Sequence, residues 1–237
     1  MSRAIRTVFV FSISCLFFSE ITNAQLVINE LSQGPSGSKE YVELLVVGNP
    51  TCDSNCVDIR GWIIDDNNGT FAAGSGRGIA QGCMRFANDP QWQCVPMGTI
   101  IVVYNFGDRN AALPPDDPTD ANGDCVYVIP EWSSLFDGNT SQPNTTNPSY
   151  TGVTFTPGGN WSSQSMNNGG DSYQTRNPNN IGVPHHAVSW GNNSNNNVIY
   201  FAGSAGQTTF FMSNAISNDP FVQANWSSGS NPGAETP

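Results

Sequence analysis

Three apolar runs near the start of the chain decide the fold: Leu26-Val-Ile-Asn-Glu-Leu31, Glu40-Tyr-Val-Glu-Leu-Leu-Val-Val47 and Val57-Asp-Ile-Arg-Gly-Trp-Ile-Ile-Asp-Asp66. Each run is short, rich in β-branched and aromatic residues, and bounded by Gly, Pro, Asn or Ser. This pattern is typical of β-strands joined by turns. In the third run the apolar parity changes at Gly61, which predicts a bulge or a close backbone approach there. The chain therefore opens as an all-β protein.

The rest of the chain continues the β pattern. Gly, Pro, Asn and Ser are abundant, and these residues favour turns and caps over helix interiors. Two segments, about 66–97 and 105–166, read as large loop insertions, although Cys125–Ile129 within the second is a short strand candidate. The other strands that we expect are Gly98–Tyr104, Gly170–Arg176, Val183–Trp190, Val198–Ala202 and Gln207–Met212. The core we expect consists of Ile28, Val42, Leu44, Val46, Trp62, Ile64 and Ile100–Val103.

Residues 1–24 have the features of a signal peptide. Arg3 and Arg6 form a basic beginning, and Val8–Phe18 is an apolar core too short to span a bilayer. Small residues before Gln25 predict cleavage between Ala24 and Gln25. We therefore expect residues 25–237 to form one domain that is secreted or displayed at the cell surface, without membrane insertion after cleavage.

Five cysteines follow the predicted cleavage point, and an oxidising compartment would allow them to form disulfides. Each of two short segments has a cysteine at both ends. We expect Cys52 to pair with Cys56 and Cys83 with Cys94, which leaves Cys125 over. Spacing alone does not fix this pairing, because Cys125 could compete for any partner.

The charge balance excludes some classes of partner. The net charge is −11, and Lys39 is the only lysine. Binding to nucleic acid or to an anionic membrane surface draws on clustered Lys and Arg. The sequence therefore argues against both kinds of partner, while an acidic chain remains compatible with divalent cations.

Several segments, taken in order, resemble the lamin tail domain family. They are Val27–Glu30, Glu40–Leu44, Val57–Asp65, Asn168–Tyr173, Ala187–Gly191 and Asn225–Trp226 followed by Thr236-Pro237. The resemblance implies an immunoglobulin-like antiparallel β-sandwich, here enlarged by the two insertions. It also implies a non-catalytic interaction module of the type found on secreted and surface proteins of bacteria. Relatives usually continue beyond this point, so we expect the chain to be the N-terminal part of a longer surface protein.

One acidic loop is a candidate calcium site. Asp120, Asn122 and Asp124 alternate in the manner of oxygen ligands at the start of a calcium loop. However, Gly123 does not fall at the turn position of an EF-hand, and no Glu closes the loop. The alternative is a solvated turn, because Asp, Asn and Gly are good turn residues.

Candidate catalytic residues are few. His185 and His186 are adjacent, so in a strand they would point to opposite faces and would not easily share a metal or a substrate. Glu30, Glu40 and Glu43 could form the acid and base of a glycosidase. We interpret these glutamates instead as outward or edge residues of a sandwich, and we expect no enzymatic activity.

Aromatic residues in turn-rich loops suggest a binding role. Trp92, Trp132 and Trp161 could stack on sugars, although loop aromatics that cover the core are the favoured interpretation. The sequence as a whole predicts a secreted, non-catalytic, monomeric binding or adhesion module for an extracellular protein or a carbohydrate. The alternatives are a secreted hydrolase with active residues in the insertions, and a structural spacer stabilised by calcium.

Overall fold

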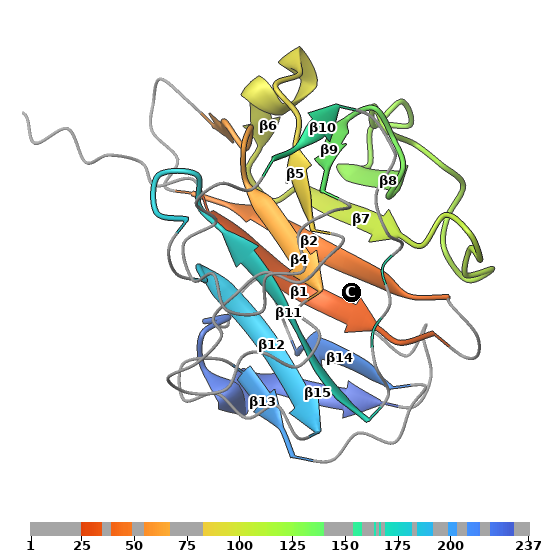
Figure 1. The fold of residues 1–237 in the computed structure, drawn as a ribbon, viewed down its shortest axis with the longest axis vertical. Helices are drawn as coiled ribbons and strands as arrows, with labels where there is room; N and C mark the ends of the chain where they lie inside the picture. Colours follow the sequence, from red (N-terminus) through yellow and green to blue (C-terminus); the bar gives the residue numbers. More distant parts are fainter. Residues whose placement is uncertain are drawn as a thin grey trace, which may run out of the picture.

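The computed structural model is a β-sandwich (Figure 1). It describes residues 25–34, 39–48, 55–66, 83–139, 154–157, 164, 166, 169–181, 184–191, 199–202, 208–213 and 219–229. The predicted signal peptide lies outside these residues. The described helices are two short 3-10 helices, Pro90–Gln93 and Gln223–Asn225. Within the described chain, no helix has the length and apolar character needed to cross a membrane.

The first sheet has six strands in the order β15-β14-β1-β2-β7-β8. Their bounds are β1 Gln25–Ser32, β2 Tyr41–Val47, β7 Ile100–Tyr104, β8 Val126–Pro130, β14 Thr209–Met212 and β15 Trp226–Gly229. The prediction is confirmed for β1, β2, β7 and β8 to within two residues at each end.

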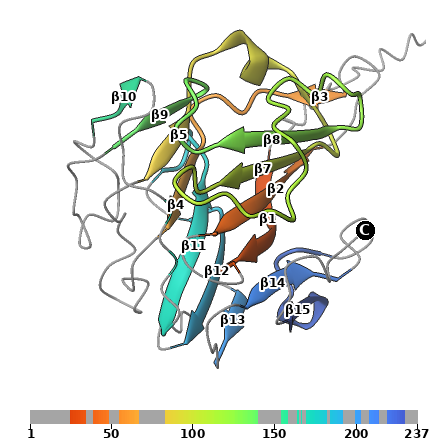
Figure 2. The same cartoon turned by 90° about the vertical axis from the view of Figure 1, so that its right-hand side faces the viewer.

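The second sheet has seven strands in the order β10-β9-β5-β4-β11-β12-β13. Their bounds are β4 Ile63–Asp66, β5 Met84–Phe86, β9 Phe136–Gly138, β10 Thr156–Pro157, β11 Gly170–Arg176, β12 His186–Gly191 and β13 Ile199–Phe201. A separate pair, β3 Cys56–Val57 and β6 Val95–Pro96, forms a two-stranded ribbon. Figure 2 shows the two large sheets from the side, with β4, β11 and β12 packed against β1 and β2.

The expectation of an antiparallel sandwich is wrong for two strand pairs. β7 pairs with β8 in parallel, and β12 pairs with β13 in parallel. A parallel pair needs a connection that returns the chain to the starting edge of the sheet. Residues 105–125 provide that return between β7 and β8. The immunoglobulin-like topology implied by the resemblance stays a prediction.

The core lies between the two large sheets, and the prediction of its members is largely confirmed. Ile28, Val42 and Leu44 are fully buried in one cluster with residues of both sheets. Strand β7 is covered on both faces, because Ile101 and Val103 join this cluster while Val102 and Tyr104 join a second one. Gly61 adopts a φ of +77°, which relieves the steric conflict that a side chain would have at the parity change.

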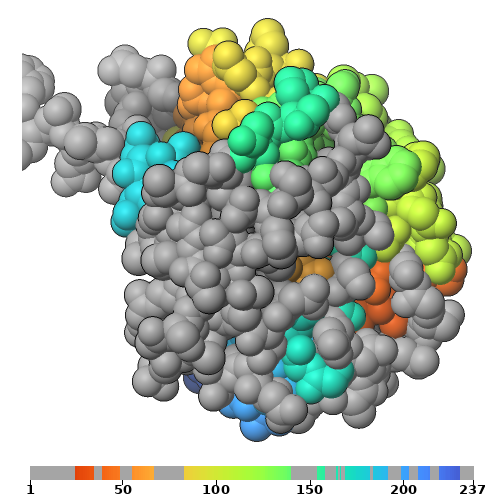
Figure 3. Space-filling view, in the orientation of Figure 1, coloured from red at the N-terminus to blue at the C-terminus, as the bar shows by residue number. Residues whose placement is uncertain are grey.

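The two predicted insertions are not simple loops. The segment 66–97 contributes β5, and the segment 105–166 contributes β9, which pairs directly with β5. Phe86, Trp92 and Phe136 from these segments are fully buried and contact one another ring to ring. The insertions therefore extend the second sheet and the core. In the space-filling view, residues 100–130 form much of one side of the molecule (Figure 3).

Candidate functional site

Polar side chains meet at the edge of the six-stranded sheet where β7 and β8 end. Because these strands run parallel, Asn105 and Glu131, which directly follow them, lie at the same edge. Glu40 precedes β2, which is antiparallel to β7, and it therefore lies there too. The Asn105 N–H donates to the Glu40 carbonyl oxygen over 3.0 Å. We call Glu40, Asn105, Glu131 and Gln164 the carboxyl cluster.

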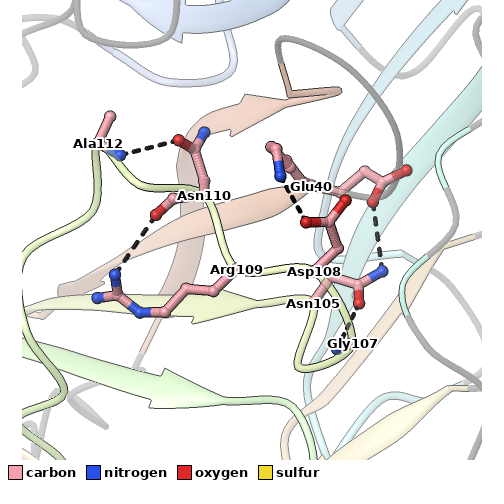
Figure 4. Close-up of polar contacts among 8 residues, drawn as sticks. Glu40, Asn105, Gly107, Asp108, Arg109, Asn110 and Ala112 are labelled. Atoms are coloured by element: carbon pink, nitrogen blue, oxygen red, sulfur yellow. Dashed lines mark hydrogen bonds and ion pairs between the residues drawn. The ribbon is translucent and has the colours of Figure 1, made fainter.

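Two carboxyl groups are buried in this cluster, with exposures of 6% for Glu40 and 0% for Glu131. The Glu131 carboxyl accepts hydrogen bonds from the backbone N–H of Phe106 at 3.2 Å and of Gln164 at 2.5 Å. The Asn105 Nδ2 donates to Glu40 Oε2 at 3.3 Å and to the Gln164 carbonyl at 2.8 Å. Figure 4 shows the Asn105 amide facing the Glu40 carboxyl. The cluster thus ties four segments of the chain together, at residues 40, 105–106, 131 and 164.

Burial shifts the titration of both carboxyl groups into the neutral range. Desolvation raises the pKa of Glu40 to about 7, against the lowering effect of its backbone and Asn105 hydrogen bonds. Desolvation likewise raises the pKa of Glu131 to about 7, with a further upward contribution from the charge of Glu40. The cluster can therefore gain or lose protons close to neutral pH.

Two exposed aromatic residues directly adjoin the cluster in sequence. Phe106 follows Asn105, and Trp132 follows Glu131. Their exposures are 51% and 45%, and their rings stack with centroids 5.2 Å apart and planes inclined by 22°. We call Phe106 and Trp132 the rim pair. Each ring covers one face of the other and leaves about half of its surface to solvent, which is unusual for large aromatic residues.

The loop after β7 is held in a defined shape (Figure 4). The Asn105 Oδ1 accepts from the Gly107 N–H at 2.9 Å, and the Asn110 Oδ1 accepts from the Ala112 N–H at 3.0 Å. Asp108 pairs with Lys39 at 2.5 Å, which links the loop to the segment before β2. These contacts fix the backbone on both sides of Phe106.

The candidate calcium loop is a network of turns. The Asp120 Oδ1 accepts from the Cys125 N–H, the Asn122 Oδ1 from the Asp124 N–H, and the Asp124 Oδ1 from the Val126 N–H, all at 2.9–3.0 Å. Nowhere in the described part of the chain do three or more His, Cys, Asp or Glu side chains form a group able to hold a metal ion. The geometry favours the turn interpretation, and calcium binding stays an untested hypothesis.

The predicted disulfide pairing is wrong. Cys56 is bonded to Cys94 because β3 and β6, which carry or follow these residues, pair with each other. Cys83 is a free thiol in the interior, and burial raises its pKa well above the ordinary value. Cys125 is free and exposed. Cys52 lies outside the described residues.

The two histidines occupy different environments, but one ring contacts both. His186 is buried between the sheets, where Nδ1 accepts from the Ile28 N–H at 3.1 Å and Nε2 donates to the Pro220 carbonyl at 3.0 Å. His185 is partly buried and lies edge-on to the Trp62 ring. Phe221 lies edge-on to both imidazoles. We call His185, His186 and Phe221 the histidine cluster.

Burial also explains the titration of this cluster. Desolvation lowers the pKa of His186 to about 4, and it lowers the pKa of His185 as well. Both rings are therefore neutral at physiological pH. The His186 hydrogen bonds hold β12 against β1, which is a structural role.

The interpretation of the glutamates as outward residues is wrong for two of the three. Glu30 and Glu40 are buried, and the Tyr41 hydroxyl donates to Glu30. Glu43 is partly buried and accepts from Asn29 Nδ2 at 3.3 Å.

The three candidate sugar-stacking tryptophans also differ. Trp92 is fully buried and donates its indole N–H to the Leu135 carbonyl, so it is a core residue. Trp132 is exposed, and Trp161 lies outside the described residues. Sequence reasoning missed Phe106, Glu131 and Gln164. A signal was present in the sequence for Phe106 and Glu131, because each lies one or two residues after an apolar run that forms a strand.

Comparison with known proteins does not place the chain in a family. No family model, curated protein or solved structure matches the chain significantly. The resemblance to lamin tail domains therefore stays a prediction.

Proposed function

We propose that this chain is a secreted, non-catalytic binding module that binds carbohydrate through the rim pair. The observation that carries the proposal is the stacked, half-exposed pair Phe106 and Trp132 on a hydrogen-bonded loop. Aromatic faces offer a large apolar contact area with few rotatable bonds, which suits the apolar face of a sugar ring. A fixed backbone on both sides of Phe106 lowers the entropy lost on binding.

Charge and compartment support the same proposal. The net charge of −11 disfavours anionic ligands and favours neutral polysaccharides over acidic ones. The Cys56–Cys94 disulfide is consistent with a location outside the cytoplasm. An extracellular protein remains the other class of partner that an exposed aromatic pair would suit.

The buried carboxyls favour a hydrolase as a second candidate, because groups that titrate near neutral pH are suited to acid–base catalysis. Two observations weigh against it. Glu131 is 0% exposed, and its carboxyl accepts two backbone N–H groups from the loops that enclose it. A catalytic carboxyl has to reach a substrate, so these bonds support a role in holding the loops.

The binding proposal can be tested by affinity electrophoresis in gels that contain soluble neutral polysaccharides. The wild-type protein should be retarded by at least one of them, and Trp132→Ala should lose roughly 30-fold in affinity, as expected for a contact worth about 2 kcal/mol. Phe221→Ala is the matched control, because Phe221 is similarly exposed (48%) but belongs to the histidine cluster. Equal losses in the two variants, or retardation by none of the polysaccharides, would contradict the proposal. Release of reducing sugar would favour the hydrolase.

A further inference from the structure

We propose that Lys39 and Asp108 form the polar end of the carbohydrate-binding site and make it selective for uncharged sugars. Lys39 donates hydrogen bonds to sugar hydroxyl groups, and Asp108 is a positioning residue that holds and neutralises the ammonium group of Lys39. This inference rests on the proposed function, because it extends the site that begins at the rim pair and names the residues that decide which sugars bind.

The first observation is that Lys39 lies in one row with the rim pair. The Asn105 N–H donates to the Glu40 carbonyl over 3.0 Å, which continues the antiparallel pairing of β2 with β7 beyond both strands. The next position in the same register places Lys39 opposite Phe106. The parallel pairing of β7 with β8 likewise places Phe106 beside Trp132, and their rings stack. Since neighbouring strands lie about 4.8 Å apart, the row forms a strip about 10 Å long.

The second observation is that this row faces solvent. Each of its three members directly adjoins a buried member of the carboxyl cluster in the sequence. Side chains alternate between the two faces along an extended chain, so the row points away from the cluster. The exposures agree, because about half of each ring of the rim pair and 28% of the Lys39 side chain are open to solvent. A ligand on the rim pair can therefore reach Lys39.

The third observation concerns the ion pair at the end of the row. Lys39 Nζ lies 2.5 Å from Asp108 Oδ1. Asp108 lies two residues after Phe106, on the loop that the Asn105 side chain holds through the Gly107 N–H (Figure 4). An ammonium group has three N–H donors, and the ion pair with one carboxylate oxygen uses one of them. Lys39 can therefore also bond to hydroxyl oxygens of a sugar that stacks on Phe106.

The fourth observation is the charge balance of this end of the site. Lys39 is the only lysine in a chain with a net charge of −11, and the Asp108 carboxylate offsets its positive charge. An acidic sugar would gain little from the neutralised ammonium group and would be repelled by the chain as a whole. An uncharged sugar needs the apolar contact and the hydrogen bonds alone, so the site favours it.

The experiment compares the affinity for a neutral and an acidic polysaccharide by affinity electrophoresis. The neutral one is whichever of hydroxyethylcellulose, galactomannan and dextran retards the wild type most, and the acidic one is polygalacturonate. Lys39→Met should bind the neutral polysaccharide about 10-fold more weakly, because it loses a hydrogen bond from a charged donor. Asp108→Asn should raise the ratio of acidic to neutral affinity about 3-fold, which is the size of a surface charge interaction. A merely structural role of Asp108 would not change this ratio.

Arg60→Met is the matched control. Arg60 pairs with Asp58 at 2.5 Å and its side chain is 31% exposed, but the pair lies between β3 and β4. This variant should leave both affinities unchanged. If Trp132→Ala weakens binding while Lys39→Met does not, or if Asp108→Asn leaves the ratio unchanged, the inference is wrong and the proposed function stands. Retardation of the wild type by none of the polysaccharides would overturn both. If Lys39→Met does not fold, Lys39→Gln decides the question.

Discussion

The carboxyl cluster and the histidine cluster are built alike and behave in opposite ways. Each places an exposed aromatic residue beside two buried or partly buried titratable side chains. In both, burial favours the neutral form. For the acids this raises the pKa to about 7, whereas for His186 it lowers the pKa to about 4. The same physical cause therefore makes one cluster change charge near neutral pH and leaves the other uncharged there.

The two clusters also give opposite dependences of stability on pH. Folding raises the pKa of Glu40 and of Glu131 from the ordinary value of 4.5 to about 7. Their contribution to the free energy of unfolding therefore falls as the pH rises from about 4.5 through 7. Folding lowers the pKa of His186 from the ordinary value of 6.5 to about 4. Its contribution to the free energy of unfolding therefore falls as the pH drops from 6.5 through about 4. Between these limits the two effects oppose each other.

The largest expected effect is a loss of stability that should affect both clusters together. Cys56→Ala with Cys94→Ala removes a disulfide that closes a sequence separation of 38 residues, and the chain-entropy relation gives a loss of about 4 kcal/mol in the free energy of unfolding. Denaturant unfolding followed by fluorescence would measure the loss. Probes at Trp132 and at the His186 imidazole should change at the same denaturant concentration. Separate transitions would show that the clusters do not belong to one cooperative unit.

The next effect is confined to the histidine cluster. His186→Ala leaves the Ile28 N–H without its acceptor and opens a cavity between the sheets, which should cost about 3 kcal/mol in the free energy of unfolding. The loss should be the same at about pH 7 and pH 8.5, because the ring is neutral at both. His185→Ala is the control and should cost less, since this side chain is only partly buried. An equal loss in both variants would contradict the structural role of His186.

The carboxyl cluster should show a smaller effect with the opposite sign. Glu40→Gln with Glu131→Gln removes two buried charges, so at about pH 8.5 the double variant should exceed the wild type by about 2 kcal/mol in the free energy of unfolding. At about pH 5 the difference should nearly vanish, because the wild-type groups are then mostly protonated. Urea unfolding at the two pH values measures this. A variant less stable than the wild type at the higher pH would argue against desolvation as the dominant cause.

Comparison of the clusters also shows what the sequence could predict. Long regular runs were readable: β11 was predicted with the bounds it has, because Gly170–Arg176 is a seven-residue strand flanked by turn formers. β5 and β9 contain three residues each, which is too short for a periodic signal. Their pairing with each other is set by the arrangement of the sheet and cannot be read locally.

The carboxyl cluster could not be predicted from the sequence for the same reason. Glu40 was a candidate, but its neighbours Asn105 and Glu131 come from distant segments that meet because β7 and β8 are parallel. The sequence suggests antiparallel pairing throughout, and that arrangement would place Glu131 at the other edge of the sheet. The disulfide was mispredicted likewise, because nearness in sequence was used where the pairing of β3 with β6 decides.

The smallest expected effect contrasts two carboxyl groups that lie next to strand β8. Asp117 pairs with Val128 of β8, and backbone N–H groups, that of Ala121 first, lower the pKa of its carboxyl. Burial instead raises the pKa of Glu131, which directly follows β8. Asp117→Asn should lower the melting temperature by a few degrees at neutral pH, and this difference should fade as the pH drops below the ordinary value of 3.8. Millimolar calcium should leave the melting temperature of the wild type unchanged, because the Asp120, Asn122 and Asp124 oxygens already accept N–H groups within the turn. A clear calcium-dependent rise would instead show that the turn rearranges around the ion, as the sequence pattern first suggested.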